Sequence, residues 1–224
     1  MFKVAVIIPL AHQVKHPAVD SMIEAILDVY EYVGWDRSKV IRKPFARGQT
    51  AMSRTWLGKE AMDEEAEWFF WMDDDMLIPP GTFQKLMDHA KTGKNIVSAT
   101  YFSRSHAVLT GEGDYPICAF DMVDAETNKP FAPPPLEPRG LKETQVVGFG
   151  CLLMHRSVFE DVWKLSKGVP FRTEGFLTED VYFLSFARKA GHSVWLDTSI
   201  VCGHLKDVCV TDKNRERLGG QPQT

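Results

Sequence analysis

Hydrophobic residues gather in short continuous runs that polar residues, glycine or proline bring to an end. Three of these runs, at residues 3–9, 68–72 and 95–101, are rich in β-branched or aromatic side chains. Continuous apolar runs are typical of strands that are covered on both faces, as in a parallel sheet. Further strands are predicted at residues 40–41, 117–122, 146–154, 194–196 and 200–202.

Longer segments between the runs carry apolar residues at helical spacing. The first begins at Pro17 and ends at Gly34. Its predicted buried stripe is Met22, Ile23, Ile26, Leu27, Tyr30 and Val33. A second helix is predicted over residues 48–66, with a buried stripe of Met52, Trp56, Ala61 and Met62. Others are predicted after Pro79-Pro80-Gly81 and at residues 156–163 and 178–191. This alternation favours an α/β fold with a mostly parallel central sheet.

The length of 224 residues is typical of one globular domain, so we expect a single domain over residues 1–224. The order of strands and helices is regular as far as residue 102. Between residues 103 and 144, glycines and a cluster of prolines separate short apolar pieces, which predicts long loops. We therefore divide the domain into residues 1–102, residues 103–210 and a polar tail at 211–224.

The charge of the chain limits the partners that it can attract. A net charge of -4 and a predicted pI near 6.0 provide no general attraction to nucleic acid or to an anionic membrane surface, so no nucleic-acid partner is expected. The apolar run at residues 3–9 is too short to span a membrane and lacks a signal-peptide cleavage pattern. The sequence therefore favours a cytoplasmic protein without an integral membrane segment.

Three consecutive aspartates, Asp73, Asp74 and Asp75, follow the predicted aromatic strand directly. Their carboxylates would repel one another without a counter-ion, and oxygen ligands of this kind suit Mg²⁺ or Mn²⁺. Ligand sites of α/β proteins lie outside the carboxyl ends of strands. We therefore predict a divalent metal site that accepts the phosphate oxygens of a substrate. The same residues also fit a solvated acidic turn at the start of the next helix.

Together with the Pro79-Pro80-Gly81 segment, the aspartates resemble the Asp-x-Asp region of glycosyltransferases of the GT-A fold, particularly those similar to glycosyltransferase family 2. The resemblance implies a three-layer α/β sandwich and a nucleoside-diphosphate-sugar donor. It also implies that Asp73 and Asp74 contact the donor, and that Asp75, together with Asp73, ligates a divalent metal, Mn²⁺ or Mg²⁺.

Three later segments extend the resemblance, in the order that the family has them. Gly148 and Gly150 lie in a segment similar to the one that lines the sugar pocket, although they also fit a β-bulge. Glu179 and Asp180 are similar to the acidic pair that supplies the general base, with Asp180 as the base, but acids at a helix start are favoured in any protein. His204 is similar to a late histidine that ligates the metal or the diphosphate; a lone histidine is more often structural.

Two arginines, Arg47 and Arg54, flank the start of the second predicted helix. A guanidinium fork suits a diphosphate or a nucleobase edge, and family members carry arginine in a similar segment, so both are candidate donor contacts. Arginine on a helix also fits a solvated face. The resemblance assigns nucleotide binding to residues 1–102, and the acceptor pocket and the base to residues 103–210.

The predicted activity is metal-dependent transfer of a sugar from a nucleoside-diphosphate sugar to an unidentified acceptor, with inversion and with Asp180 as base. The Gln/Arg-x-x-Arg-Trp motif of processive members does not occur, which disfavours processive transfer. The resemblance thus implies a non-processive, hexosyltransferase-like enzyme. A sugar nucleotidyltransferase is disfavoured because residues 10–16 lack a glycine-rich loop for a triphosphate. It stays an alternative, together with a metal-dependent nucleotide-sugar phosphohydrolase and a binding module whose acids are structural.

Overall fold

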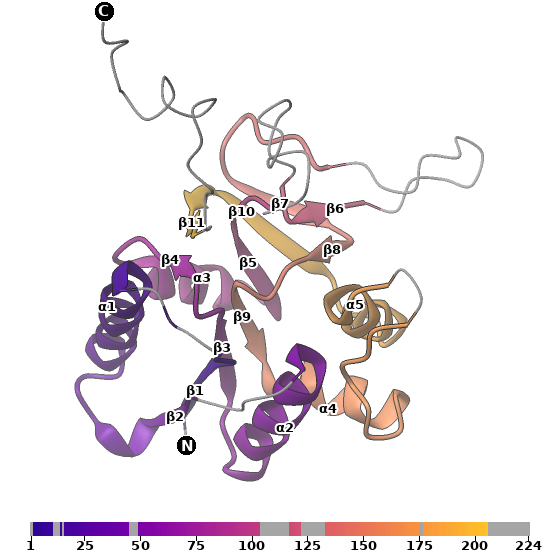
Figure 1. Ribbon diagram of the computed structural model, residues 1–224, viewed down its shortest axis with the longest axis horizontal. Coiled ribbons are helices and arrows are strands. Elements are labelled where there is room, and N and C mark those ends of the chain that lie inside the picture. The colour runs from indigo at the N-terminus through magenta and orange to yellow at the C-terminus, as the bar shows by residue number, and fades with distance from the viewer. Residues whose placement is uncertain are drawn as a thin grey trace, which may run out of the picture.

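The computed structural model describes residues 2–10, 14, 16–44, 49–103, 117–121, 133–174 and 177–205. A seven-stranded sheet lies at the centre of these residues, and helices cover both of its faces (Figure 1). The predicted α/β fold and its three-layer sandwich are therefore confirmed. Part of the predicted loop region, Arg47 and the polar tail lie outside the described residues.

The strands of the central sheet follow the order β2 (Val40–Pro44), β1 (Val4–Ile8), β3 (Trp68–Met72), β9 (Cys151–His155), β5 (Ile96–Thr100), β10 (Val194–Val201) and β7 (Leu141–Thr144). Strand β1 pairs in parallel with β2 and β3, and β5 pairs in parallel with β10. Strand β9 is antiparallel to both β3 and β5, and β7 is antiparallel to β10. All strands except β9 and β7 thus run the same way, as the prediction of a mostly parallel sheet requires.

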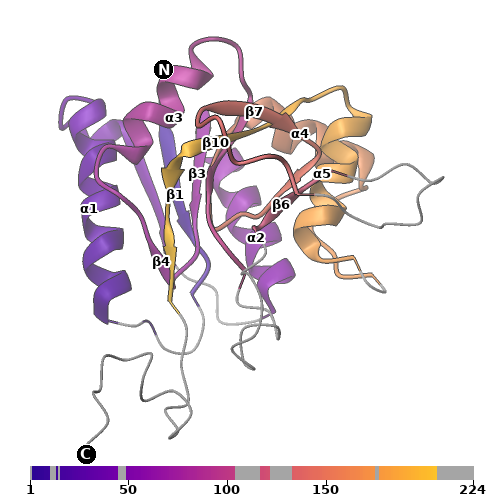
Figure 2. The same cartoon turned by 90° about the horizontal axis from the view of Figure 1, so that it is seen from above.

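Two groups of helices form the outer layers of the sandwich (Figures 1 and 2). Helices α1 (His16–Tyr32) and α3 (Thr82–Ala90) cover one face of the sheet. Helices α2 (Thr50–Asp63), α4 (Arg156–Leu165) and α5 (Glu179–Lys189) cover the other. Neighbouring residues of β1 enter different cores because successive side chains of a strand point to opposite faces. Within the described residues, no helix is long and apolar enough to cross a bilayer.

Short elements bring distant segments to the edge of the sheet where β3 ends. Strand β4 (Met76–Leu77), directly after the aspartates, pairs with β11 (Gly203–His204). Strand β6 (Ala119–Phe120) pairs with β8 (Val146–Val147). A single 3-10 turn, η1 (Arg37–Lys39), precedes β2. The β4–β11 pair therefore places His204 beside the aspartate run.

The buried face of α2 differs from the predicted stripe. The spacing predicts Met52 and Trp56 in the core, but their exposed fractions are 64% and 58%. The inward face consists of Ser53, Arg54, Leu57, Gly58 and Ala61. Position 58 faces inward against the Phe159 ring. Only glycine fits there, because a β-carbon would lie 2.3 Å from that ring. The hydrophobic spacing is misleading because a glycine and an arginine occupy inward positions.

Other elements also depart from the expected boundaries. On α1, the predicted core residues Ile23 and Leu27 are exposed, whereas the smaller Ala18 and Ala25 are buried. The predicted strand at 146–154 is interrupted between β8 and β9 by residues 148–150. The two short strands predicted at 194–196 and 200–202 are mostly one strand, β10, whose register shifts between Asp197 and Val201.

Candidate active site

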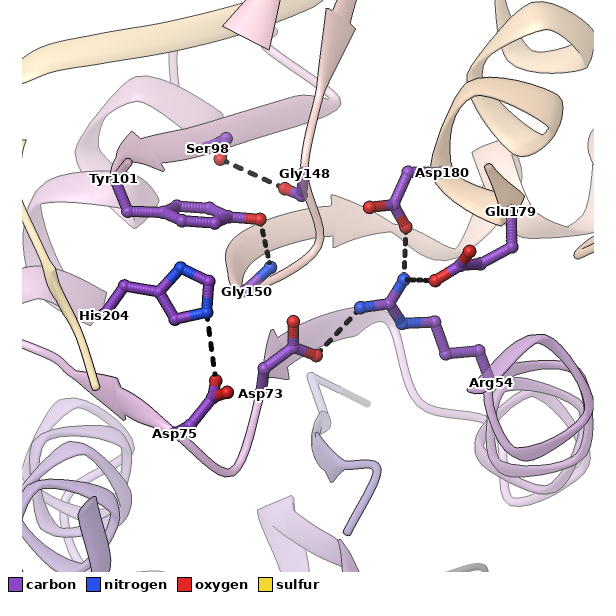
Figure 3. Close-up of polar contacts among 10 residues, drawn as sticks. All are labelled: Arg54, Asp73, Asp75, Ser98, Tyr101, Gly148, Gly150, Glu179, Asp180 and His204. Atoms are coloured by element: carbon purple, nitrogen blue, oxygen red, sulfur yellow. Dashed lines mark hydrogen bonds and ion pairs between the residues drawn. The ribbon is translucent and has the colours of Figure 1, made fainter. Parts of the chain in front are cut away.

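Polar residues from five segments meet at the edge of the sheet where β3 and β5 end. The aspartates follow β3, and the backbone N–H of Asp73 donates to the carbonyl oxygen of Gly150 at 3.0 Å. Tyr101 follows β5, and Asp180 lies in the first turn of α5. Figure 3 shows that these side chains form two clusters, one around Arg54 and one around His204.

The first cluster surrounds the guanidinium of Arg54, whose side chain is 3% exposed. Its Nη2 atom donates to Oδ1 of Asp73 at 2.8 Å. Its Nη1 atom donates to Oε1 of Glu179 at 2.9 Å and to Oδ1 of Asp180. A single side chain of α2 therefore joins the end of β3 to the start of α5.

Burial and neighbouring charges shift the protonation equilibria in this cluster. Burial raises the pKa of Asp180 from 3.8 to about 7; Arg54 opposes the shift, whereas Glu179 and Asp73 add to it. Burial acts to lower the pKa of Arg54, but the three carboxylates outweigh it and raise the pKa above its usual value. The cluster thus contains a permanent cation and a carboxyl that ionises near neutral pH.

The second cluster joins Asp75 to His204. Their side chains are each 14% exposed, and Oδ1 of Asp75 lies 3.4 Å from Nε2 of His204. The Nδ1 atom of His204 lies 2.8 Å from the carbonyl oxygen of Phe102. A carbonyl oxygen only accepts hydrogen bonds, so Nδ1 carries a proton and Nε2 faces the carboxylate.

Tyr101 packs against His204 and explains why both positions of the predicted sugar-binding segment are glycines. Its hydroxyl accepts a hydrogen bond from the backbone N–H of Gly150 at 3.0 Å. A β-carbon on Gly148 would lie 1.8 Å from this hydroxyl oxygen, and one on Gly150 would lie 2.8 Å from Cζ of the ring. Glycine at these positions lets the backbone approach the buried phenol. Between them, Phe149 donates its backbone N–H to Asp180.

The structure separates the aspartates that the sequence treats as one group. Asp73 bonds to Arg54, Asp75 lies against His204, and Asp74 between them is buried. No group of three or more metal-binding side chains occurs among the described residues. Arg47 lies outside the residues that the structure describes.

Sequence reasoning did not single out two residues that shape the site, Tyr101 and Phe149. Tyr101 ends a predicted strand at the same edge of the sheet as the aspartates, and this position was an available signal. Phe149 stands between two glycines, which mark close backbone approach. Its contacts with Arg54 and Asp180 join segments that are far apart in the sequence, which residue spacing does not reveal.

Comparison with solved structures finds the same fold in other proteins. The crystal structure of A197 from STIV gives a TM-score of 0.60 at 16% identity, over 92% of this chain and 87% of that chain. GalNAc-T7, crystallised with UDP, GalNAc and Mn²⁺, gives a TM-score of 0.60 at 10% identity, over 93% of this chain and 44% of that chain. At such identities the likeness is one of fold. A sequence search of curated proteins found no match.

The three-layer sandwich and its solved neighbours define a protein of the GT-A fold. A sequence model described as glycosyl transferase family 2 matches residues 20–163, more than half of the chain. The chain belongs to glycosyl transferase family 2. The resemblance read from the sequence is therefore confirmed, and membership implies a nucleotide-sugar donor and an acceptor.

Proposed function

We propose that the protein transfers one sugar from a nucleoside-diphosphate donor to an acceptor hydroxyl, with inversion and with a divalent metal. The observation that carries this proposal is the position of Asp180. Its carboxyl, with a pKa of about 7, lies at the carboxyl edge of the sheet beside the aspartate run. A general base is most effective when its pKa is near the working pH.

Asp180 is suited to accept the proton of an incoming hydroxyl group. In the proposed step, the acceptor oxygen forms a bond to the anomeric carbon while the bond from that carbon to the diphosphate oxygen breaks. The hydroxyl proton passes to Asp180. Hydrogen bonds from Arg54 and from the Phe149 backbone hold the carboxylate in one orientation, which favours transfer at a fixed angle.

The residues around Asp75 fit a divalent metal. The Asp75 carboxylate and Nε2 of His204 provide oxygen and nitrogen donors, and the bond from Nδ1 to the Phe102 carbonyl orients the imidazole for binding through Nε2. Mn²⁺ and Mg²⁺ are commonly held by one or two protein groups together with phosphate oxygens. A bound ion would offset the negative charge of the diphosphate leaving group.

The remaining assignments follow from the two clusters. We assign donor contacts to Asp73, which bonds to Arg54 beside the base, and to Asp74, the next residue of the run. Nucleotide binding would then fall to residues 1–102, and the acceptor pocket to residues 103–210. Transfer of one sugar per binding event fits the missing processive motif. Arg47 and the two glycines stay predicted donor contacts.

Calorimetric titration with UDP, GDP, CDP and dTDP, each with and without Mn²⁺, tests the donor and the metal together. We expect metal-dependent binding of one diphosphate and its loss in Asp75→Ala. Asp88→Ala is the matched control because Asp88 is an exposed carboxylate bonded to Lys91 and Gln84 on α3. Absence of binding to all four diphosphates by the wild-type protein would contradict the proposal.

Product analysis separates sugar transfer from hydrolysis by a phosphohydrolase. A glycosyltransferase releases the nucleoside diphosphate, whereas a nucleotide-sugar phosphohydrolase releases a nucleoside monophosphate and a sugar 1-phosphate. NMR of the anomeric proton of the product tests inversion. Retention of the donor configuration would contradict the role of Asp180 as the base of a single displacement.

A further inference from the structure

Arg54 enters the site from the inward face of α2, where its neighbours Leu57 and Ala61 belong to the hydrophobic core. Helices usually direct arginine to solvent, yet this side chain is 3% exposed. Its carboxylate partners come from two other elements, β3 and α5. Figure 3 shows the guanidinium between them, on the side of the site away from His204.

A buried ion cluster is a weak source of stability. Apolar residues of similar volume in place of buried ion pairs are often neutral or stabilising, by about 1–4 kcal/mol. In addition, the buried Nε atom of Arg54 has no hydrogen-bond partner among the described residues, which carries a further cost. Orientation of the carboxylates, rather than stability, is therefore the effect to attribute to this guanidinium.

Arg54 and Phe149 both hold the carboxyl group of Asp180. Nη1 of Arg54 donates to Oδ1 of Asp180, and the backbone N–H of Phe149 donates to the same carboxyl group. The Phe149 ring also lies against the guanidinium, with 5.2 Å between Cζ of Arg54 and the ring centroid. Arg54 and Phe149 thus hold each other as well as the carboxyl group.

Charged and titratable groups face Asp180 from several elements. Arg54 faces it from α2, Asp73 from the end of β3 and Glu179 from its own helix, while the neutral phenol of Tyr101 faces it from the end of β5. Arg54 is the cation among these described groups. Without its guanidinium, three carboxylates would face one another and at least one would turn away or take up a proton.

We propose that Arg54 is a positioning residue, whose guanidinium fixes the Asp180 carboxylate at the start of α5 relative to Asp73 at the end of β3. Arg54 would thereby set the place of the base relative to the bound donor. This inference rests on the proposed function, in which Asp180 is the base. It gives Arg54 no direct contact with the reacting atoms.

Arg54→Lys and Arg54→Ala test the proposal. Lysine keeps the charge but lacks the fork that reaches several carboxylates, whereas alanine leaves space that free guanidinium can enter. Arg156→Met is the matched control, because Arg156 forms a surface pair with Glu160 on α4. The assay measures diphosphate release from UDP-glucose, UDP-N-acetylglucosamine, UDP-galactose and GDP-mannose with Mn²⁺ and water as acceptor, alongside calorimetric binding of UDP and GDP.

We expect both substitutions to lower kcat about 100-fold, the scale of a base misplaced by about 1 Å. KM and diphosphate affinity should change much less, because the backbone bond from Asp73 to Gly150 keeps Asp73 at the end of β3. Guanidinium chloride below the unfolding range should restore part of the activity of Arg54→Ala, whereas equal sodium chloride should not. A wild-type kcat in Arg54→Lys would overturn the proposal. So would a folded Arg54→Ala whose lost activity guanidinium does not restore. If Arg54→Ala does not fold, Arg54→Lys decides alone.

A second readout does not depend on turnover. In protein with ¹³C-labelled aspartate, the Asp180 carboxyl signal, assigned by its loss in Asp180→Asn, should titrate at higher pH in Arg54→Ala and return toward the wild-type midpoint with guanidinium. An unchanged midpoint would overturn the positioning role. If the wild-type protein neither binds a diphosphate nor releases one, the proposed function fails, while this titration still decides the role of Arg54.

Discussion

The hydroxyl oxygen of Tyr101 lies 1.8 Å from the position that a β-carbon on Gly148 would occupy. Tyr101 is buried and its ring packs edge-on against His204, with the ring centroids 5.5 Å apart. Space for the phenol therefore depends on the missing side chain of Gly148. The ring that packs against His204 thus fits only because position 148 is a glycine.

Gly148→Ala is expected to destabilise the protein by about 1–3 kcal/mol, because the added methyl group must displace Tyr101 in a packed core. Urea denaturation measures the change in the free energy of unfolding. In a double-mutant cycle, Tyr101→Ala should relieve the clash, so the combined loss should be smaller than the sum of the two. If the two losses of unfolding free energy simply add, the new methyl group does not clash with Tyr101, which would contradict this account of Gly148.

Two neighbouring positions on α2 should respond very differently to alanine. Leu57 is buried, and Leu57→Ala should cost about 2–5 kcal/mol through lost burial and a residual cavity. Trp56 is exposed, and Trp56→Ala should change the free energy of unfolding by about 0.5 kcal/mol or less. Thermal denaturation of the pair checks the inward face of the helix, and a larger loss for Trp56→Ala would contradict it.

The rate of transfer should increase with pH up to about 7. Burial favours the neutral acid of Asp180, with a pKa raised from 3.8 to about 7, and only the carboxylate accepts a proton. The stability of the fold should change in the opposite direction and decrease as the pH rises. The contribution of this carboxyl is fully present below about pH 4 and is lost as the pH rises through about 7. A pH profile of kcat and urea denaturation across this range measure both.

Asp180→Asn provides the control for both pH effects. The amide does not ionise, so residual activity should lose the rise toward pH 7 and the stability loss over the same range should shrink. If Asp180→Asn keeps the wild-type pH profile, the titrating group is not Asp180.

His204→Ala should weaken the Mn²⁺-dependent part of diphosphate binding by about 10-fold or more, since even groups that only support metal ligands commonly contribute this much. Binding without Mn²⁺ should change little. The measurement is calorimetric titration with and without EDTA. His192→Ala is the control, because His192 pairs with Asp161 beyond the far end of α5. Equal losses in the two variants would contradict a metal role for His204.

Much of the layer structure could be predicted from the sequence, because strands that are buried on both faces appear as continuous apolar runs. Residues 68–72 form β3 with the predicted bounds, and the segment before α3 ends in Gly81 with a φ of 73°, a conformation that glycine adopts readily. The reversed direction of β9 could not be predicted, because a strand in the centre of a sheet has the same apolar pattern whichever way it runs.

The candidate site could be predicted only in part, for a different reason. Asp73 and Asp75 were found as candidates because they follow a strand, whereas Glu179, Asp180 and His204 were found through the resemblance to family 2 glycosyltransferases. Their division into two clusters depends on long-range contacts, such as the one between Arg54 and Asp180. Residue spacing carries no information about such pairs. It also misled on α2, where apolar residues face outward.

The position of β9 between β3 and β5 has a consequence for synthesis of the chain. When residue 102 leaves the ribosome, both neighbours of β9 are present, but the strand that joins them is not yet made. Their facing edges then present unpaired backbone groups, which attract other chains. We expect the central sheet to close only after residues 151–155 emerge.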